Sequence, residues 1–197
     1  CYPSTMRLSF KKHDILTLQE LDDAVYEVQL WALSKGMIPI AAIISRPVDH
    51  ERHEVLGFGH NELADGIPGV HGETGAVKGM GRIAGGYADL VATSSLSPCP
   101  FCQCTLARQL GIKSVRILDD LNYRPDKGDY LKAGISPIVS SHKKIEETFA
   151  VWVNDPQNEV LWKRDIGIAT GARVPPRRFT PDEVAALMIR ARRIAQQ

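Results

Sequence analysis

The sequence predicts an α/β protein, arranged as a three-layer α/β/α sandwich around a mixed five-stranded sheet and followed by an extra C-terminal helix. Short apolar runs of strand length alternate along the chain with longer segments of helical periodicity. Turn-forming glycine, proline and aspartate residues separate these segments. The chain has 197 residues, which suffice for one domain with a sizeable core or for two small ones.

The first helix is expected to begin directly after Thr17. The segment Thr17-Leu-Gln-Glu20 is a capping box, in which the Thr17 hydroxyl and the Glu20 carboxylate satisfy the first helical amides. Apolar residues follow at helical spacing as far as Ala32. Gly36 then supplies a C-terminal stop.

Five strands are predicted, over residues 38–45, 55–60, 88–94, 114–119 and 136–140. The first two should pair as an antiparallel hairpin, because a short turn-rich stretch joins them, and the others should be mostly parallel. Further helices are predicted over residues 71–82, 97–111 and 142–153, with loops at residues 61–70 and 119–128.

The C-terminal segment is separable from the rest, so we assign residues 1–167 to one domain and residues 168–197 to an extension. Pro175-Pro176 interrupts the chain, and a second capping box follows at residues 180–183. The predicted helix beyond it is amphipathic and basic, with an apolar stripe and three arginines near its end: Val184, Leu187, Met188, Ala191, Ala195, Arg190, Arg192 and Arg193. Its partner, whether its own domain or another subunit, stays open.

Charge and cysteine distribution exclude several classes of protein. The 24 Lys and Arg residues against 23 Asp and Glu leave a net charge of +1, which disfavours nucleic acid as the main partner. No apolar run approaches the roughly 20 residues that span a bilayer, and residues 1–14 lack the apolar core of a secretory signal. Cys99, Cys102 and Cys104 are clustered, whereas a disulfide scaffold spreads its cysteines. We therefore expect a cytoplasmic, reducing environment.

The residues that carry chemistry are His71-Gly72-Glu73 and Pro98-Cys99-Pro-Phe-Cys102. One imidazole and two thiolates provide three zinc ligands and leave the fourth tetrahedral position open for water. Both groups fall at predicted helix N-termini, where the helix dipole favours negative charge. Glu73 lies two residues from His71, so its carboxylate can exchange protons with that water without being a ligand. The spacing H-x-E…P-C-x-x-C is the signature of zinc nucleobase deaminases.

The surrounding sequence disfavours two simpler interpretations of the cysteines. A thioredoxin-like redox pair at Cys99 and Cys102 would not predict His-x-Glu upstream. A structural zinc site needs a fourth ligand, and Cys104 stands at i+2 from Cys102, which points it away on a helix. Cys104 and Cys1 are therefore expected to be bystanders.

Further motifs make the resemblance more specific. They are Val55-Leu-Gly-Phe-Gly-His-Asn61, His71-Gly-Glu73, Ser97-Pro-Cys99-x-x-Cys102, Asn122-Tyr123 with Lys127-Gly128 and Tyr130-Leu131, and Trp162-x-x-Asp165-Ile166-Gly167. On these motifs, residues 17–167 resemble the cytidine deaminase superfamily and, within it, the yeast-type cytosine deaminases. The sequence departs from that family at Tyr123, where the family has Phe, and in the residues that follow Gly167.

The resemblance implies a role for each matching residue. It implies Zn²⁺ bound by His71, Cys99 and Cys102, with Glu73 as the catalytic acid and base. It also implies substrate contacts from Asn61 and Asp165 to the ring edge, from the Gly72 amide to the exocyclic oxygen and from the Ser97 carbonyl to the amine. His71, Tyr123 and Trp162 would sandwich and cover the base. A homodimer is implied as well.

The expected function is zinc-dependent hydrolytic deamination of a free aminopyrimidine base, most simply cytosine and water to uracil and ammonia. Another small aminated heterocycle or a nucleoside is the first alternative. A tRNA adenosine deaminase is opposed by the neutral charge, although the arginines of the predicted terminal helix favour it. A non-catalytic zinc module is opposed by the open ligand position and by Glu73.

Overall fold

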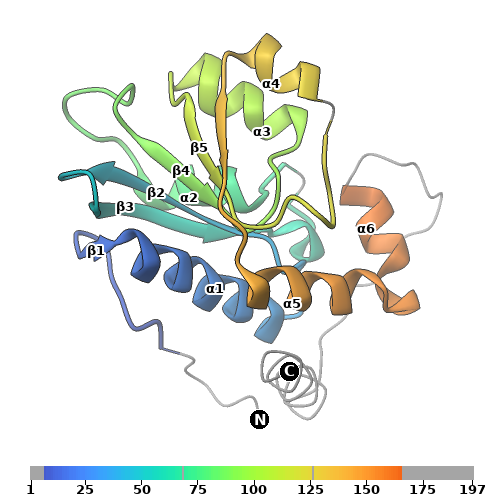
Figure 1. Cartoon of the computed structure of the whole chain (residues 1–197). Helices are drawn as coiled ribbons and strands as arrows, with labels where there is room; N and C mark the ends of the chain where they lie inside the picture. The colour runs from blue at the N-terminus through green and yellow to red at the C-terminus, as the bar shows by residue number, and fades with distance from the viewer. Residues whose placement is uncertain (1–6, 68, 126, 166–197) are drawn as a thin grey trace.

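The structure is a computed structural model that describes residues 7–67, 69–125 and 127–165. Its centre is a mixed sheet of six strands in the order β1-β3-β2-β4-β5-β6 (Figure 1). The strands are β1 Ile15–Thr17, β2 Ala41–Pro47, β3 Arg52–His60, β4 Val91–Ser94, β5 Ser114–Ile117 and β6 Ser136–Val139. The C-terminal extension, with its predicted helix, lies outside the described residues.

The strand directions agree with the prediction that the first two predicted strands form an antiparallel hairpin and that the others are mostly parallel. β2 pairs antiparallel with both β3 and β4, while β4, β5 and β6 run parallel. The predicted number of five strands is wrong, because β1 pairs antiparallel with β3 as a sixth strand at the sheet edge. With three residues, β1 is too short to show a period-two pattern, and its pairing comes from backbone hydrogen bonds.

The helices are α1 Leu18–Ser34, α2 Gly72–Met80, α3 Pro100–Cys104, α4 Lys127–Ala133, α5 Lys143–Val153 and α6 Glu159–Asp165. α1 begins at the predicted capping box, where the Thr17 side chain accepts from the Glu20 amide. A π-helical segment, Thr105–Gln109, continues α3. α4 and α6 were not predicted. Among the described residues, no helix is long and apolar enough to cross a bilayer.

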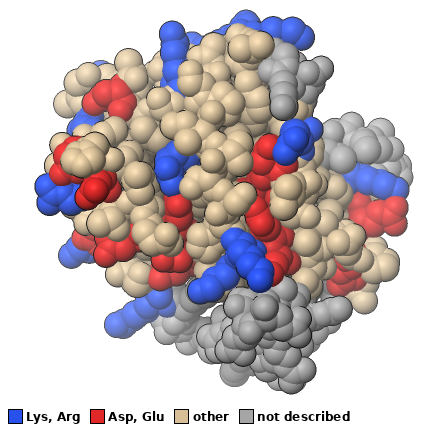
Figure 2. Space-filling model, viewed as in Figure 1, with Lys and Arg blue, Asp and Glu red and all other residues tan. Residues whose placement is uncertain are grey.

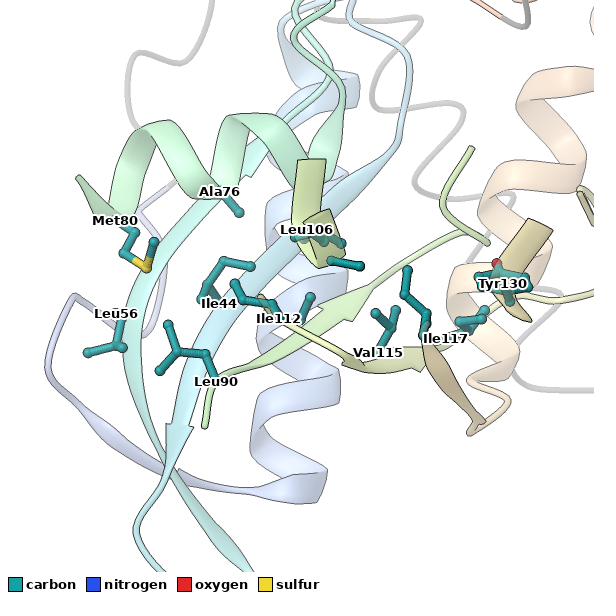
Figure 3. Close-up of a cluster of buried hydrophobic side chains, with 14 residues drawn as sticks. Ile44, Leu56, Ala76, Met80, Leu90, Leu106, Ile112, Val115, Ile117 and Tyr130 are labelled. Carbon is teal, nitrogen blue, oxygen red and sulfur yellow. The ribbon is translucent and has the colours of Figure 1, made fainter. Parts of the chain in front are cut away.

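Buried side chains on alternate positions of β2 belong to two different clusters. Ala41 and Ile43 pack with residues of α1 and α5, whereas Ala42 and Ile44 pack with residues of α2, of the π-helical segment Thr105–Gln109 and of α4. Figure 3 shows the second cluster, in which Ala76 and Met80 of α2 and Leu106 lie over the sheet. Because successive side chains of a strand point to opposite faces, helices cover both faces of the sheet.

Glycines bring α2 unusually close to β3. A Cβ atom at Gly59 would lie 2.2 Å from the carbonyl carbon of Gly75, and one at Gly75 would lie 2.8 Å from the carbonyl oxygen of His60. Any larger residue at either position would push the helix off the strand. This contact fixes the N-terminus of α2, and therefore His71 and Glu73, relative to the sheet.

Candidate metal and catalytic site

Two helix N-termini meet at one end of the sheet. His71 is the N-cap residue of α2, and Cys99 is the N-cap residue of α3, both with extended backbone. Cys102 follows in the first turn of α3 and is buried. The sequence predicted helix starts at both motifs, and the structure brings the two starts together although 28 residues separate His71 from Cys99.

The donor atoms of these three residues fit a zinc ion. His71 Nδ1 lies 3.3 Å from Cys99 Sγ and 3.5 Å from Cys102 Sγ. Zn–N and Zn–S bonds of about 2.0–2.3 Å in a tetrahedron place neighbouring donors about 3.3–3.8 Å apart. Within the described part of the chain, these residues form the one group of three or more His, Cys, Asp or Glu donors within 4.8 Å of one another. The group is compatible with a metal ion, and the exposed Cys104 is not part of it.

The two thiols differ in their charge. The hydrogen bond from Cys102 lowers the pKa of Cys99 to about 4, against the effect of burial and with help from His71. The same hydrogen bond, together with burial, raises the pKa of Cys102 well above its usual range. Burial lowers the pKa of His71, but its hydrogen bond with Cys99 and the charge of Asp165 raise it to about 9. Without a metal ion, the Cys99 thiolate therefore pairs with a protonated His71 while Cys102 keeps its proton. Metal ligands bind in their deprotonated forms, so binding of a cation would release the protons of His71 and Cys102.

Glu73 lies beside this donor group, in the first turn of α2, and is 2% exposed. Burial raises the pKa of its carboxyl, and the neighbouring Cys99 thiolate raises it further. Ser94 Oγ at the end of β4 donates to Glu73 Oε1 at 2.9 Å. A carboxyl with a raised pKa at a metal-ligand cluster is suited to take up and release protons near neutral pH.

A small pocket opens onto Glu73 and onto two residues of the donor group, His71 and Cys99. Its volume is about 20 Å³, which is room for a water molecule. It is lined by Ile40, His71, Glu73, Leu96, Ser97, Cys99, Tyr123, Trp162 and Asp165. Tyr123 and Trp162 meet edge to face with ring centroids 5.7 Å apart, and Phe149 of α5 supports Trp162 at 5.3 Å. Aromatic walls with a few polar groups are typical of sites for small planar ligands.

Asn61 and Asp165 contact each other, although the resemblance implies that both contact substrate. Asn61 Nδ2 donates to Asp165 Oδ1 at 2.6 Å, and Asp165 Oδ1 lies 3.8 Å from His71 Nε2. Burial raises the pKa of Asp165, while His71 and the hydrogen bond from Asn61 lower it. Asp165 lines the pocket, and Asn61 contacts Asp165 without being among the lining residues.

The remaining predicted residues occupy different positions. Ser97 lines the pocket, and its Oγ donates to Asp120 Oδ1 at 2.9 Å. Gly72 is the first residue of α2 and is not among the lining residues. A Cβ at Gly72 would lie 3.0 Å from the backbone nitrogen of Ala41, so the residue is restricted by close packing against β2.

A chain of hydrogen bonds holds Asn61 from the opposite side. Lys35 Nζ lies 3.4 Å from His60 Nε2, and His60 Nδ1 lies 2.9 Å from the Asn61 carbonyl oxygen. A protonated lysine only donates, so His60 Nε2 accepts and Nδ1 carries the hydrogen. Because the Leu63 amide donates to Asn61 Oδ1 at 2.9 Å, Asn61 presents its NH₂ group to Asp165.

Four residues that build the site were not predicted from the sequence. They are Ile40 and Leu96 in the pocket wall, Ser94 against Glu73 and His60 behind Asn61. Ser94 had one available signal, its place at the carboxyl end of a predicted strand, where ligand sites of open α/β sheets gather. Ile40 and Leu96 look like ordinary core residues in the sequence.

No family model and no curated protein matches the chain, but several solved structures do. A dCMP deaminase from the cyanophage S-TIM5 is 18% identical with a TM-score of 0.45, covering 62% of this chain and 95% of its own. A structure from a study of tRNA:A34 deaminases is 14% identical with a TM-score of 0.48, covering 63% and 98%. A guanine deaminase from Bacillus subtilis is 17% identical with a TM-score of 0.42, covering 92% and 98%.

Proposed function

We propose that this protein is a zinc-dependent hydrolytic deaminase of the cytidine deaminase superfamily, acting on a free aminopyrimidine, with cytosine and water giving uracil and ammonia. The observation that carries the proposal is the donor group of His71, Cys99 and Cys102 beside a buried Glu73 that faces the same pocket. A purely structural zinc site needs neither the pocket nor the buried carboxyl.

The residues of the chain divide the reaction between them. Zinc, held by His71, Cys99 and Cys102, would supply the Lewis-acid chemistry that makes water nucleophilic near neutral pH. Glu73 takes a proton from the attacking water and gives it to the ring nitrogen beside the amine-bearing carbon. It then takes the second proton of that water and gives it to the departing amine. Glu73 therefore ends ionised, and water and base become ammonia and the oxo base.

The pocket walls hold the substrate in this proposal. His71, Tyr123 and Trp162 stack against and cover the ring, while the Ser97 carbonyl accepts from the amine and the Gly72 amide donates to the exocyclic oxygen. Asn61 offers a donor and Asp165 an acceptor to the ring edge, once substrate replaces their mutual hydrogen bond. A ligand whose ring edge lacks either matching group would leave a buried polar atom of Asn61 or Asp165 unpaired. The site would therefore discriminate strongly against such analogues.

One observation favours a second substrate class, another small aminated heterocycle. Tyr123 lines the pocket, and its hydroxyl adds a polar group where the yeast-type enzymes have Phe. A nucleic-acid substrate has less support, since Lys and Arg are interspersed with Asp and Glu on the face in Figure 2, and neither sign covers it. The three-layer sandwich, the domain of residues 1–167, the homodimer and the cytoplasmic location belong to this same proposal.

The test is ammonia release by zinc-loaded protein with cytosine, 5-methylcytosine, cytidine, isocytosine, guanine and creatinine. We expect cytosine to be turned over by the natural protein and not by the Glu73→Gln variant. Turnover of another base, but not of cytosine, would support the deaminase reaction and assign a different substrate. Failure with every compound, at a confirmed zinc stoichiometry, would contradict the proposal for small amines.

A further inference from the structure

Ser94 lies directly behind the proposed catalytic carboxyl, outside the motifs that identify the site. It is the last residue of β4 and is fully buried, at 0% exposure. The strand is paired on both sides, with Ala42 of β2 opposite Ser94 on one side and Ile117 of β5 on the other. The Leu118 amide also donates to the Ser94 carbonyl. The position of the Ser94 hydroxyl is therefore set by the sheet.

The hydroxyl has one hydrogen-bond partner of consequence for the chemistry. Ser94 Oγ lies 2.9 Å from Glu73 Oε1. An ionised carboxylate only accepts, so the hydroxyl donates to it. Hydrogen bonds to a charged acceptor are stronger than neutral ones, and they matter most where water is excluded.

Glu73 needs such a contact to keep its position. A glutamate side chain has three rotatable bonds, and a proton carrier must stay within hydrogen-bond reach of the atoms it serves. A fixed donor at one carboxylate oxygen restricts those rotations.

We propose that Ser94 is a positioning residue, which holds the Glu73 carboxylate through Oε1 and keeps it at the pocket. The inference rests on the proposed deaminase function. It adds a residue from β4 to the machinery that α2 and α3 supply. Ser94 touches neither the substrate nor the zinc ligands in this proposal, so it acts through Glu73.

The neighbouring residue provides a matched control. Ser95 is also buried, at 1% exposure, and its Oγ accepts from the Ala41 amide at 2.9 Å. Replacing either serine by alanine removes one buried hydrogen bond from the same end of β4. Only Ser94 contacts Glu73, so a difference in catalysis between the two variants reports on that contact.

The experiment compares Ser94→Ala, Ser94→Thr and Ser95→Ala with the natural protein for kcat, KM, zinc content and thermal midpoint. We expect Ser94→Ala to lower kcat about 10- to 100-fold, the size of effect that a misplaced catalytic group produces. KM and zinc content should stay near the natural values. Ser94→Thr, which keeps a hydroxyl, should recover most of kcat, and Ser95→Ala should lose stability without a comparable loss of kcat.

A second readout does not depend on turnover. In protein labelled with ¹³C at the glutamate carboxyl carbons, with the signal assigned by Glu73→Gln, Ser94→Ala should shift the Glu73 signal and Ser95→Ala should not. Natural kcat in Ser94→Ala, or an equal kcat loss in Ser95→Ala, would overturn the inference. If the natural protein releases no ammonia while the Glu73 signal still shifts, the proposed function fails and the contact is structural.

Discussion

The two sides of the pocket are built in different ways. On one side, His71, Glu73 and Cys99 stand at the starts of helices that pack on the sheet, with α2 seated on β3 through glycine contacts. On the other side, Asn61 and Asp165 come from a loop and from the seven-residue helix α6, and they hold each other. Packing against the sheet fixes the first side, whereas in the proposed function the second side exchanges the Asn61–Asp165 hydrogen bond for contacts to substrate. We infer that the first side sets the chemistry and the second sets the substrate.

The largest effect is expected at the first side, from Glu73→Gln. The amide keeps the shape and the hydrogen bond to Ser94 but cannot carry protons, so kcat should fall by at least about 10²- to 10⁴-fold. Zinc content should be unchanged. Glu62→Gln is the matched control, because Glu62 is a carboxylate paired with the exposed Lys78 and is not among the residues that line the pocket. A Glu73→Gln variant with near-natural kcat would contradict the assigned role.

Zinc removal should act on the first side of the pocket, because the donor residues His71 and Cys99 lie there. Chelation should abolish turnover and lower the thermal midpoint, because an ion bound only by the folded chain stabilises it by about 4 kcal/mol at 1,000 times its Kd. Cys102→Ala should lose zinc-dependent stabilisation. Cys104→Ala should keep it, since Cys104 is exposed and lies outside the donor group. A midpoint independent of zinc in the natural protein would argue against the metal site.

A smaller effect is expected at the second side, from Asp165→Asn. The variant keeps the shape of the side chain but loses the charge that accepts from Asn61. If Asp165 recognises a ring N–H, kcat/KM should fall about 10- to 150-fold, which corresponds to the loss of about 1.5–3 kcal/mol that is usual for a hydrogen bond to a charged group. Zinc content should stay constant. A fall in zinc content of the same extent would instead assign Asp165 to the support of His71, 3.8 Å away.

The same division explains what the sequence could predict. The residues of the metal-compatible donor group and Glu73 lie at short spacings within two motifs at helix starts, and such local spacing can be recognised in a sequence. Asn61 and Asp165 are 104 residues apart, so their contact depends on the tertiary fold. In the sequence, nothing distinguishes Ser94 from the other small residues of a predicted buried strand. β1 and α6 contain three and seven residues, too few for their periodicity to stand out.

The smallest effect concerns pH and the support behind Asn61. Burial lowers the pKa of His60 below its usual 6.5, and the charge of Lys35 lowers it too, although the Asn61 carbonyl and the carboxylates of Glu62 and Asp65 oppose this. The unfolded chain therefore binds the proton more readily than the folded chain. As pH falls below 6.5, the free energy of unfolding should decrease, by at most about 1.4 kcal/mol per pH unit for one such group.

His60→Gln should reduce this slope, measured by urea unfolding between pH 7 and pH 5. The exposed His50 supplies the control, because His50→Gln removes a histidine whose side chain is 87% exposed and should leave the slope unchanged. His53 is buried with a lowered pKa as well, so part of the slope should remain in His60→Gln. An unchanged slope in His60→Gln would mean that the Lys35–His60–Asn61 chain tolerates a protonated imidazole. The position of Asn61 would then depend less on the neutral form of His60 than the hydrogen bonds indicate.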